Sequence, residues 1–147
     1  MKNVIFLSLG IALIIVSCTQ QEIKSPIEGV WQQVGFSSVS GDTVTNYKLP
    51  SPNLGSQIKT WSKNYFTFIG IMKIDTTDID LYGSGTYTLN GDKYEENIVY
   101  HNDKTLIKTK FKALLEIRND TLIQKGVLLD DWTLPRQYGI EKYVRLE

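Results

Sequence analysis

The stretch IEGVWQQVGF, residues 27–36, places a glycine two residues before a tryptophan at the start of a strand-like run. Glycine adopts backbone conformations that other residues avoid, so Gly29 allows the chain to bend sharply as it enters the strand. Trp31 follows this bend within a run that has the residue pattern of a β-strand. The stretch therefore predicts a first strand that begins with a sharp bend.

The rest of the chain alternates strand signals with turn signals. Turns such as NGD at 90–92 favour hairpins, because Asn and Gly accept the positive φ that tight turns require. Runs rich in Val, Ile, Thr, Tyr and Phe predict about eight strands, at 29–39, 57–62, 65–74, 83–89, 94–101, 106–118, 122–129 and 139–146. We expect an all-β, up-and-down antiparallel barrel, because closure removes exposed strand edges. The longest connection, 43–56, is expected to cross one mouth of this barrel.

The N-terminal segment has the pattern of a targeting sequence. Lys2 precedes a mainly apolar stretch at 4–16, which is shorter than the about 20 residues that a membrane span needs. The stretch ends at Ser17-Cys18 and resembles a bacterial lipobox, in which the cysteine receives a diacylglyceryl group and is acylated, for example with palmitate. The alternative is an ordinary secretory signal with an incidental cysteine. Cys18 is the only cysteine of the chain, and a lone thiol in an oxidising compartment favours the lipidated form.

These features predict three segments: a signal peptide over 1–17, a polar tether over 18–26 and a barrel domain over 27–147. Two lipid attachments on one cysteine hold a membrane durably, whereas one acyl chain is marginal. We therefore expect a protein anchored by its lipid in the bacterial cell envelope, at the outer membrane.

Charge and motifs exclude several classes of function. Sixteen basic residues balance sixteen acidic ones, so no net field attracts nucleic acid. Lys108, Lys110 and Lys112 are expected on one solvated strand face. The sequence carries no catalytic or phosphate-binding signature, and we expect no enzyme activity, no cofactor and no metal.

Two polar segments are expected to be solvent-exposed turns, and each has metal or haem binding as a weaker alternative. His101 is expected to be an exposed turn residue, with ligation of haem or a metal through Tyr100 and His101 as the alternative. The run DTTDID, 75–80, is expected to be a solvated hairpin loop, with weak calcium binding as the alternative.

Strand alternation predicts which side chains face the interior. At 94–101 the more apolar face carries Glu96, which is either paired with an inward cation or tyrosine or serves as a polar anchor for a ligand. Residues 65–74 are apolar on both faces, which predicts a covered outer face or an interface. We expect a cavity that is lined by side chains from neighbouring hairpins, namely Tyr87, Tyr94, Glu96, Tyr100, Phe111 and Leu115.

The pattern Gly29-x-Trp31, with Arg145 near the end of the chain, resembles the lipocalin pattern. The run GTYTLNGDKYEENI at 85–98 and the ending at Tyr143-Val144-Arg145 are similar to the lipocalin-like domains of bacterial envelope lipoproteins. The resemblance implies that Trp31 plugs one end of the barrel and that Arg145 packs across its ring.

The barrel and the resemblance together leave two classes of function. In the first, the barrel binds a small apolar or amphipathic ligand at the membrane. In the second, the barrel is filled by its own side chains and serves as an interaction or structural subunit with an envelope protein partner.

Overall fold

The structure is a computed structural model, and it describes residues 24–147. Within these residues the chain forms nine β-strands and one short 3₁₀ helix. In chain order they are β1 (Gly29–Ser40), β2 (Thr43–Lys48), β3 (Gly55–Ser62), β4 (Tyr65–Ile74), β5 (Thr77–Asn90), β6 (Lys93–His101), η1 (Lys104–Leu106), β7 (Lys110–Arg118), β8 (Thr121–Gly126) and β9 (Gln137–Arg145).

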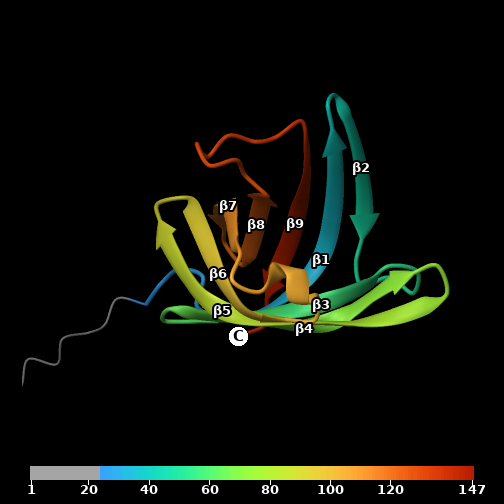
Figure 1. Ribbon diagram of the computed structural model, residues 1–147, viewed down its shortest axis with the longest axis horizontal. Helices are drawn as coiled ribbons and strands as arrows, with labels where there is room; N and C mark the ends of the chain where they lie inside the picture. The colour runs from blue at the N-terminus through green and yellow to red at the C-terminus, as the bar shows by residue number, and fades with distance from the viewer. Residues whose placement is uncertain (1–23) are drawn as a thin grey trace, which may run out of the picture.

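The strands form one antiparallel sheet that closes on itself. From β3 to β9 each strand pairs with the next one in the chain, and β9 pairs back to β1. The first half of β1 pairs with β3, and its second half pairs with β2. Figure 1 shows the β1–β2 hairpin rising away from the β4–β5 hairpin, so that the two tips lie apart. The expected closed, up-and-down barrel is therefore confirmed.

An aromatic plug closes one end of the barrel. Trp31 is fully buried there, and its indole nitrogen donates a hydrogen bond to the carbonyl oxygen of Ile27 at 2.8 Å. Trp61 packs edge-on against Trp31, Tyr94 and Tyr143, with ring centroids 6.0–6.4 Å apart. We call these four aromatic residues the base cluster. Edge-to-face contacts suit aromatic rings because the positive edge of one ring meets the negative face of another.

Gly29 and Arg145 complete this end. The chain enters β1 at Gly29 with φ of +133°, and a Cβ atom there would lie 2.4 Å from the carbonyl oxygen of Glu147. The sharp entry expected from the sequence is present, and both the backbone conformation and the lack of space require glycine. Arg145 lies directly opposite Trp31 in the pairing of β1 with β9, so the two side chains share the inner face.

The strand boundaries correct several expectations. Residues 43–48 form β2, whereas the sequence suggested a connection without strands; every residue of β2 is exposed, so no alternation marks it. β7 begins at Lys110 rather than at 106, because η1 and the positive φ of Lys108 precede it. Lys108 therefore lies outside the strand that carries Lys110 and Lys112. β8 ends at Gly126 instead of continuing to 129.

The run DTTDID is also different from the expected loop. The turn between β4 and β5 is short, and β5 begins at Thr77, six residues earlier than expected. Asp78 and Asp80 consequently lie on a strand, where Asp78 forms an ion pair with Lys73 of β4.

An irregularity between β5 and β6 reverses the expected orientation of two residues. Gly85 pairs with Ile98 while Ser84 pairs with Tyr100, so the register shifts by one residue at this point. Because side chains alternate with a period of two, this shift turns Tyr100 outward and His101 toward the interior. Tyr100 is 68% exposed, and the expectation that it lines the cavity is wrong. His101 packs against Phe68, with the ring centroids 5.6 Å apart, and it is not the exposed turn residue that was expected.

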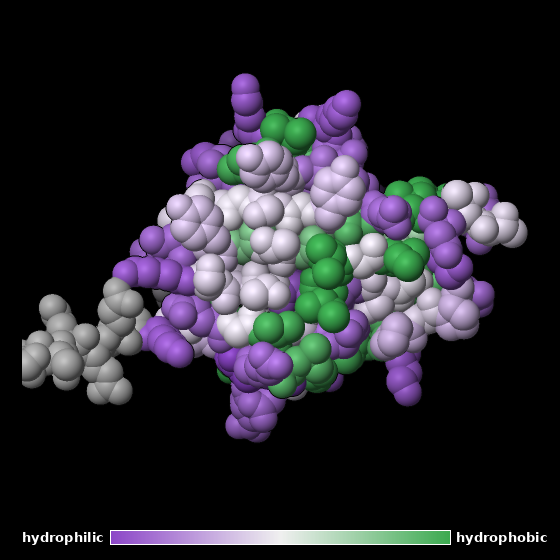
Figure 2. All heavy atoms as spheres, turned by 90° about the horizontal axis from the view of Figure 1, so that it is seen from below, coloured by the Kyte–Doolittle hydropathy of each residue, from purple (hydrophilic) through white to green (hydrophobic). Residues whose placement is uncertain are grey.

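The outer face of β4 and β5 is apolar and open in the part of the chain that the structure describes. Figure 2 shows green and white side chains gathered on the face seen from below. Its large exposed residues are Tyr65, Ile69, Ile71 and Tyr82. The apolar character expected from the sequence is therefore present on this face.

The predicted signal peptide, the lipidation site Cys18 and most of the tether lie outside the described residues. Within residues 24–147, no helix is long and apolar enough to cross a membrane.

Candidate ligand-binding site

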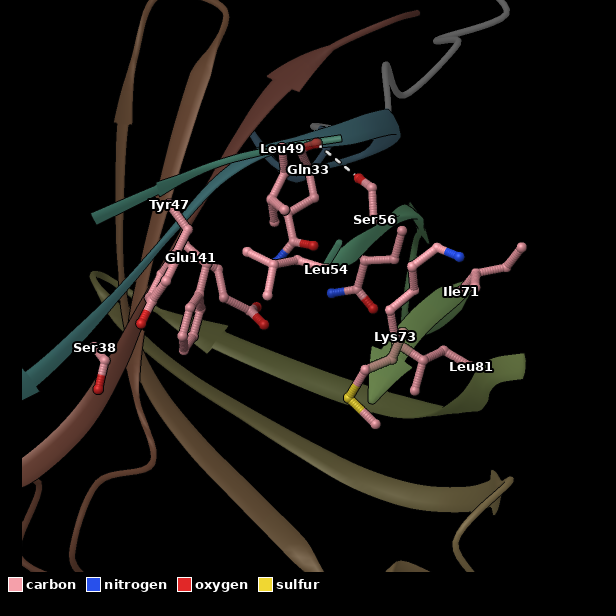
Figure 3. Close-up of a pocket in the computed structure, with 13 residues that line it drawn as sticks. Gln33, Ser38, Tyr47, Leu49, Leu54, Ser56, Ile71, Lys73, Leu81 and Glu141 are labelled. Atoms are coloured by element: carbon pink, nitrogen blue, oxygen red, sulfur yellow. Dashed lines mark hydrogen bonds between the residues drawn. The ribbon is translucent and has the colours of Figure 1, made fainter. Parts of the chain in front are cut away.

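A cavity of about 500 Å³ lies between the β1–β2 hairpin, the 49–54 segment, β3, the end of β4, β5 and β9. Figure 3 shows its lining side chains, with Glu141 reaching into the space between them. The walls are mainly apolar and include Phe36, Leu49, Leu54 and Leu81. The 49–54 segment contributes two of these leucines, so the part of the expected connection that follows β2 lines the cavity.

Two smaller hollows adjoin this cavity on the inner side of the barrel. One has a volume of about 240 Å³ and shares Gln57, Leu81 and Glu141 with the main cavity. The other, of about 250 Å³, shares Phe36 and Glu141 with it. Glu141 therefore lines all three spaces.

The inner end of this space carries a buried ion pair. The Lys59 ammonium contacts Glu96, and the two residues are only 3% and 4% exposed. The Tyr94 hydroxyl donates to the same carboxylate oxygen at 2.7 Å, and it accepts a hydrogen bond from the Trp61 indole nitrogen at 2.7 Å. The ammonium also lies 5.0–5.9 Å from the ring centroids of four aromatic residues, Trp61, Phe66, Phe68 and Tyr94. Glu96 was expected either to pair with an inward cation or tyrosine or to anchor a ligand, and these contacts match the first alternative.

A second hydrogen-bonded chain ends at Glu141. The Gln57 amide donates to the Tyr143 hydroxyl at 2.7 Å, and that hydroxyl donates to Glu141 Oε2 at 2.7 Å. The Gln124 amide donates to the same oxygen at 3.0 Å. Gln124 is 3% exposed, and its own carbonyl oxygen is buried without a hydrogen-bond partner. A buried polar atom of this kind is uncommon in folded proteins, where such atoms are almost always paired.

Burial shifts the ionisation of this second chain. Desolvation raises the pKa of Glu141, although Lys59 and the Tyr143 hydrogen bond oppose the shift. Desolvation also raises the pKa of Tyr143 well above its usual range, and the neighbouring Glu141 raises it further. The pKa of Tyr94 is likewise raised, first by burial and then by Glu96. Both tyrosines therefore remain neutral hydrogen-bond donors at ordinary pH.

The residues predicted to line the cavity divide into three groups. Glu96 and Phe111 line the hollow next to the main cavity. Tyr87, Tyr94 and Leu115 are buried in the hydrophobic core around the base cluster. They face inward as alternation predicts, but they line none of the three spaces. Tyr100 is exposed on the outside.

Four polar residues that line these spaces or bond to their lining are not marked by a motif in the sequence. Glu141 and Tyr143 share a face of β9 with Arg145, since the three positions alternate along one strand. Gln57 and Lys59 are related to Trp61 on β3 in the same way. Alternation from Arg145 and Trp61 would have placed all four inside the barrel.

The alternatives involving metal or haem are not favoured by this geometry. Tyr100 and His101 point to opposite faces of β6 and cannot ligate one centre together. The His101 Nδ1 atom accepts a hydrogen bond from the Asp103 backbone N–H at 2.9 Å. Within residues 24–147, no cluster of three His, Cys, Asp or Glu side chains is placed to hold a metal ion.

The described residues thus define an up-and-down β-barrel that is plugged at one end and hollow toward the other. Comparison with models of protein families gives no match, and comparison with curated proteins gives none either. Among solved structures, the chain is similar to a lipocalin-like protein from Bacteroides uniformis, with 18% sequence identity and a TM-score of 0.49. The similarity covers 82% of this chain and 98% of that chain.

Proposed function

We propose that this protein binds a small amphipathic molecule in the cavity of its barrel. The observation that carries the proposal is the open space of about 500 Å³, with mainly apolar walls and the carboxylate of Glu141 among its lining groups. Small-molecule sites typically measure about 300–1,000 Å³ and combine apolar walls with a few well-placed polar groups. A barrel of about eight strands is large enough to hold one small ligand when its side chains do not fill it.

The second candidate function is an interaction subunit that uses its outer face. The exposed apolar residues of β4 and β5, among them Ile69, Ile71 and Tyr82, favour it. That function was expected together with a barrel filled by its own side chains. The cavity is a specific observation in favour of ligand binding, and we therefore place the interaction subunit second.

We also propose that the barrel is held at the bacterial cell envelope by lipid on Cys18. Support comes from the lipobox-like ending of the apolar N-terminal segment and from the single cysteine. Membrane fractionation of the Cys18→Ala variant tests this. The variant should be released from the membrane fraction, and retention at the wild-type level would place the anchor elsewhere.

Two measurements test the ligand-binding function. Native mass spectrometry of protein purified from its own membrane should show an additional small-molecule mass. Titration with the neutral fluorescent probe N-phenyl-1-naphthylamine should show saturable binding of one molecule per chain. A barrel that carries no extra mass and does not bind the probe would contradict the proposal and favour the interaction subunit.

A further inference from the structure

The two buried hydrogen-bonded chains differ in how completely their polar groups are satisfied. In the first chain, one ammonium and one hydroxyl meet the single carboxylate of Glu96, so charge and hydrogen bonds balance. In the second chain, the hydrogen bonds from Tyr143 and Gln124 both reach Oε2 of Glu141. The carbonyl oxygen of Gln124 has no donor at all. The surroundings of Glu141 therefore have more acceptors than donors.

The orientation of the Gln124 amide is fixed by its neighbour. Its nitrogen donates to the Glu141 carboxylate, and a flipped amide would place an oxygen against that carboxylate instead. The unpaired atom is therefore the carbonyl oxygen, which is an acceptor. What the site lacks is a donor.

The charged side chains of the interior are also unbalanced, because one carboxylate has no cation paired with it. Six titratable side chains line the three spaces, namely Tyr47, Lys59, Lys73, Glu96, His101 and Glu141. Lys59 is paired with Glu96, and Lys73 is paired with the exposed Asp78 at the rim. Glu141 is left with neutral hydrogen-bond donors and no cation of its own. Glu141 is partly buried, and a carboxylate that is shielded from water is costly unless it is paired, so an added cation would be favourable there.

We infer that the cavity takes an amphipathic ligand with a protonated amine as its head group, which donates to Glu141. This inference rests on the proposed function and names the chemistry of the ligand. The ammonium supplies both the missing donors and the missing positive charge, and the alkyl or aryl part lies against Phe36, Leu54 and Leu81. An anionic head group such as a fatty-acid carboxylate would instead place its negative charge against the carboxylate of Glu141.

Three probes with one tail and different head groups test the inference: decylamine, decanol and decanoate. Each competes at pH 7 against N-phenyl-1-naphthylamine on the wild-type protein. Decylamine should bind about 10- to 100-fold more tightly than decanol, which is the range for a hydrogen bond to a charged group. Decanoate should bind more weakly than decanol.

Two variants assign the preference to its residue. Glu141→Gln should bind decylamine and decanol with similar affinity, because the charge is removed while the side-chain shape is kept. Glu116→Gln, on the outer side of β7 beside Arg118, is the matched control and should keep the wild-type preference. A preference for decylamine that persists in Glu141→Gln would overturn the assignment to this residue.

The outcomes separate this inference from the proposed function. If decanol or decanoate binds the wild type as tightly as decylamine, the amine inference is wrong, while ligand binding stands. If neither the three probes nor the fluorescent compound binds, both fail. The comparison on the wild type decides the head group even if Glu141→Gln does not fold.

Discussion

Arg145 covers the ring of Trp31 at the closed end of the barrel, with the guanidinium carbon 4.2 Å from the ring centroid. Its two terminal nitrogens donate to the carbonyl oxygens of Glu28 and Pro26, at 2.6 Å and 2.8 Å. The contact therefore joins the last strand to the segment that leads into the first one. A guanidinium over an indole ring contributes about 0.5–2 kcal/mol, depending on how far it is desolvated.

Removal of either partner should destabilise the barrel. Trp31→Ala should lower the free energy of unfolding by about 3–5 kcal/mol, as expected for a buried aromatic residue. Arg145→Ala should cost about 1.5–3 kcal/mol, because hydrogen bonds from a charged group are lost. Urea denaturation measures both values. Arg118→Ala, at an exposed arginine, is the control and should change the stability little. Equal effects of the two arginine substitutions would contradict the role of Arg145 in closure.

Gly29→Ala should destabilise the protein more than Gly91→Ala. Both glycines have positive φ, but a Cβ atom at Gly91 would have no atom within 4 Å. At Gly29 it would lie 2.4 Å from the Glu147 carbonyl oxygen and 2.6 Å from Arg145 Nη1. At Gly91 the left-handed conformation alone costs a non-glycine residue roughly 1–2 kcal/mol. The φ of +133° at Gly29 is less accessible still to other residues, and the contacts there add to the cost. Thermal denaturation of the two variants checks the order, and equal melting temperatures would show that the base can relax around the added methyl group.

Lys59→Met should be strongly destabilising, because it leaves Glu96 buried without its cation. Breaking a buried ion pair in this way typically costs about 3–5 kcal/mol. The double variant Lys59→Met/Glu96→Gln removes both charges of the pair. It should recover a large part of the stability that Lys59→Met alone loses. Chemical denaturation of the wild type, both single variants and the double variant gives the coupling energy. Additive effects of the two substitutions would mean that the pair does not act as a unit.

The Glu141→Gln variant should become more stable relative to the wild type as the pH rises from acidic to neutral. Burial raises the pKa of Glu141 in the folded protein, so the folded state keeps this proton to a higher pH than the unfolded state does. The wild type therefore loses stability as the pH rises from the unfolded pKa, about 4.3, through the raised folded pKa. The glutamine variant lacks this contribution. The difference in free energy of unfolding between the two proteins, measured at several pH values, should grow in favour of the variant across this window. A difference that is constant with pH would contradict the raised pKa.

The expectations that succeeded rest on a family resemblance and on strand alternation. The resemblance to the lipocalin pattern placed Trp31 and Arg145 at the base, and alternation placed Glu96 and Phe111 inside. Tyr100 failed because the register shift beside Ile98 reverses every side chain beyond it, and the sequence of β6 does not mark this shift. Strand β2 was missed because all its residues are exposed, so it lacks the apolar alternation that identifies a half-buried strand.

The division between core and cavity depends on the closed barrel rather than on one strand. Tyr87, Tyr94 and Leu115 face inward as Glu96 does, but they lie at the level of the base cluster and pack there. Strand alternation gives the face of a side chain, whereas its height along the barrel depends on how the strands are staggered. The importance of Glu141 likewise follows only when β3, β8 and β9 bring Gln57, Gln124 and Tyr143 around it.

The central claim, that a ligand occupies the cavity, is tested most directly by filling that cavity. Leu81 points into it, whereas the next residue, Tyr82, is 51% exposed on the outer face. Leu81→Trp should weaken binding of N-phenyl-1-naphthylamine by at least about ten-fold, because the added ring occupies space that the probe needs. A ten-fold weaker affinity corresponds to a loss of about 1.4 kcal/mol of binding free energy. Tyr82→Trp, at the neighbouring position on the same strand, should bind as the wild type does. Unchanged affinity in a folded Leu81→Trp variant would contradict the account, and loss of binding only in Tyr82→Trp would place the ligand on the outer face instead.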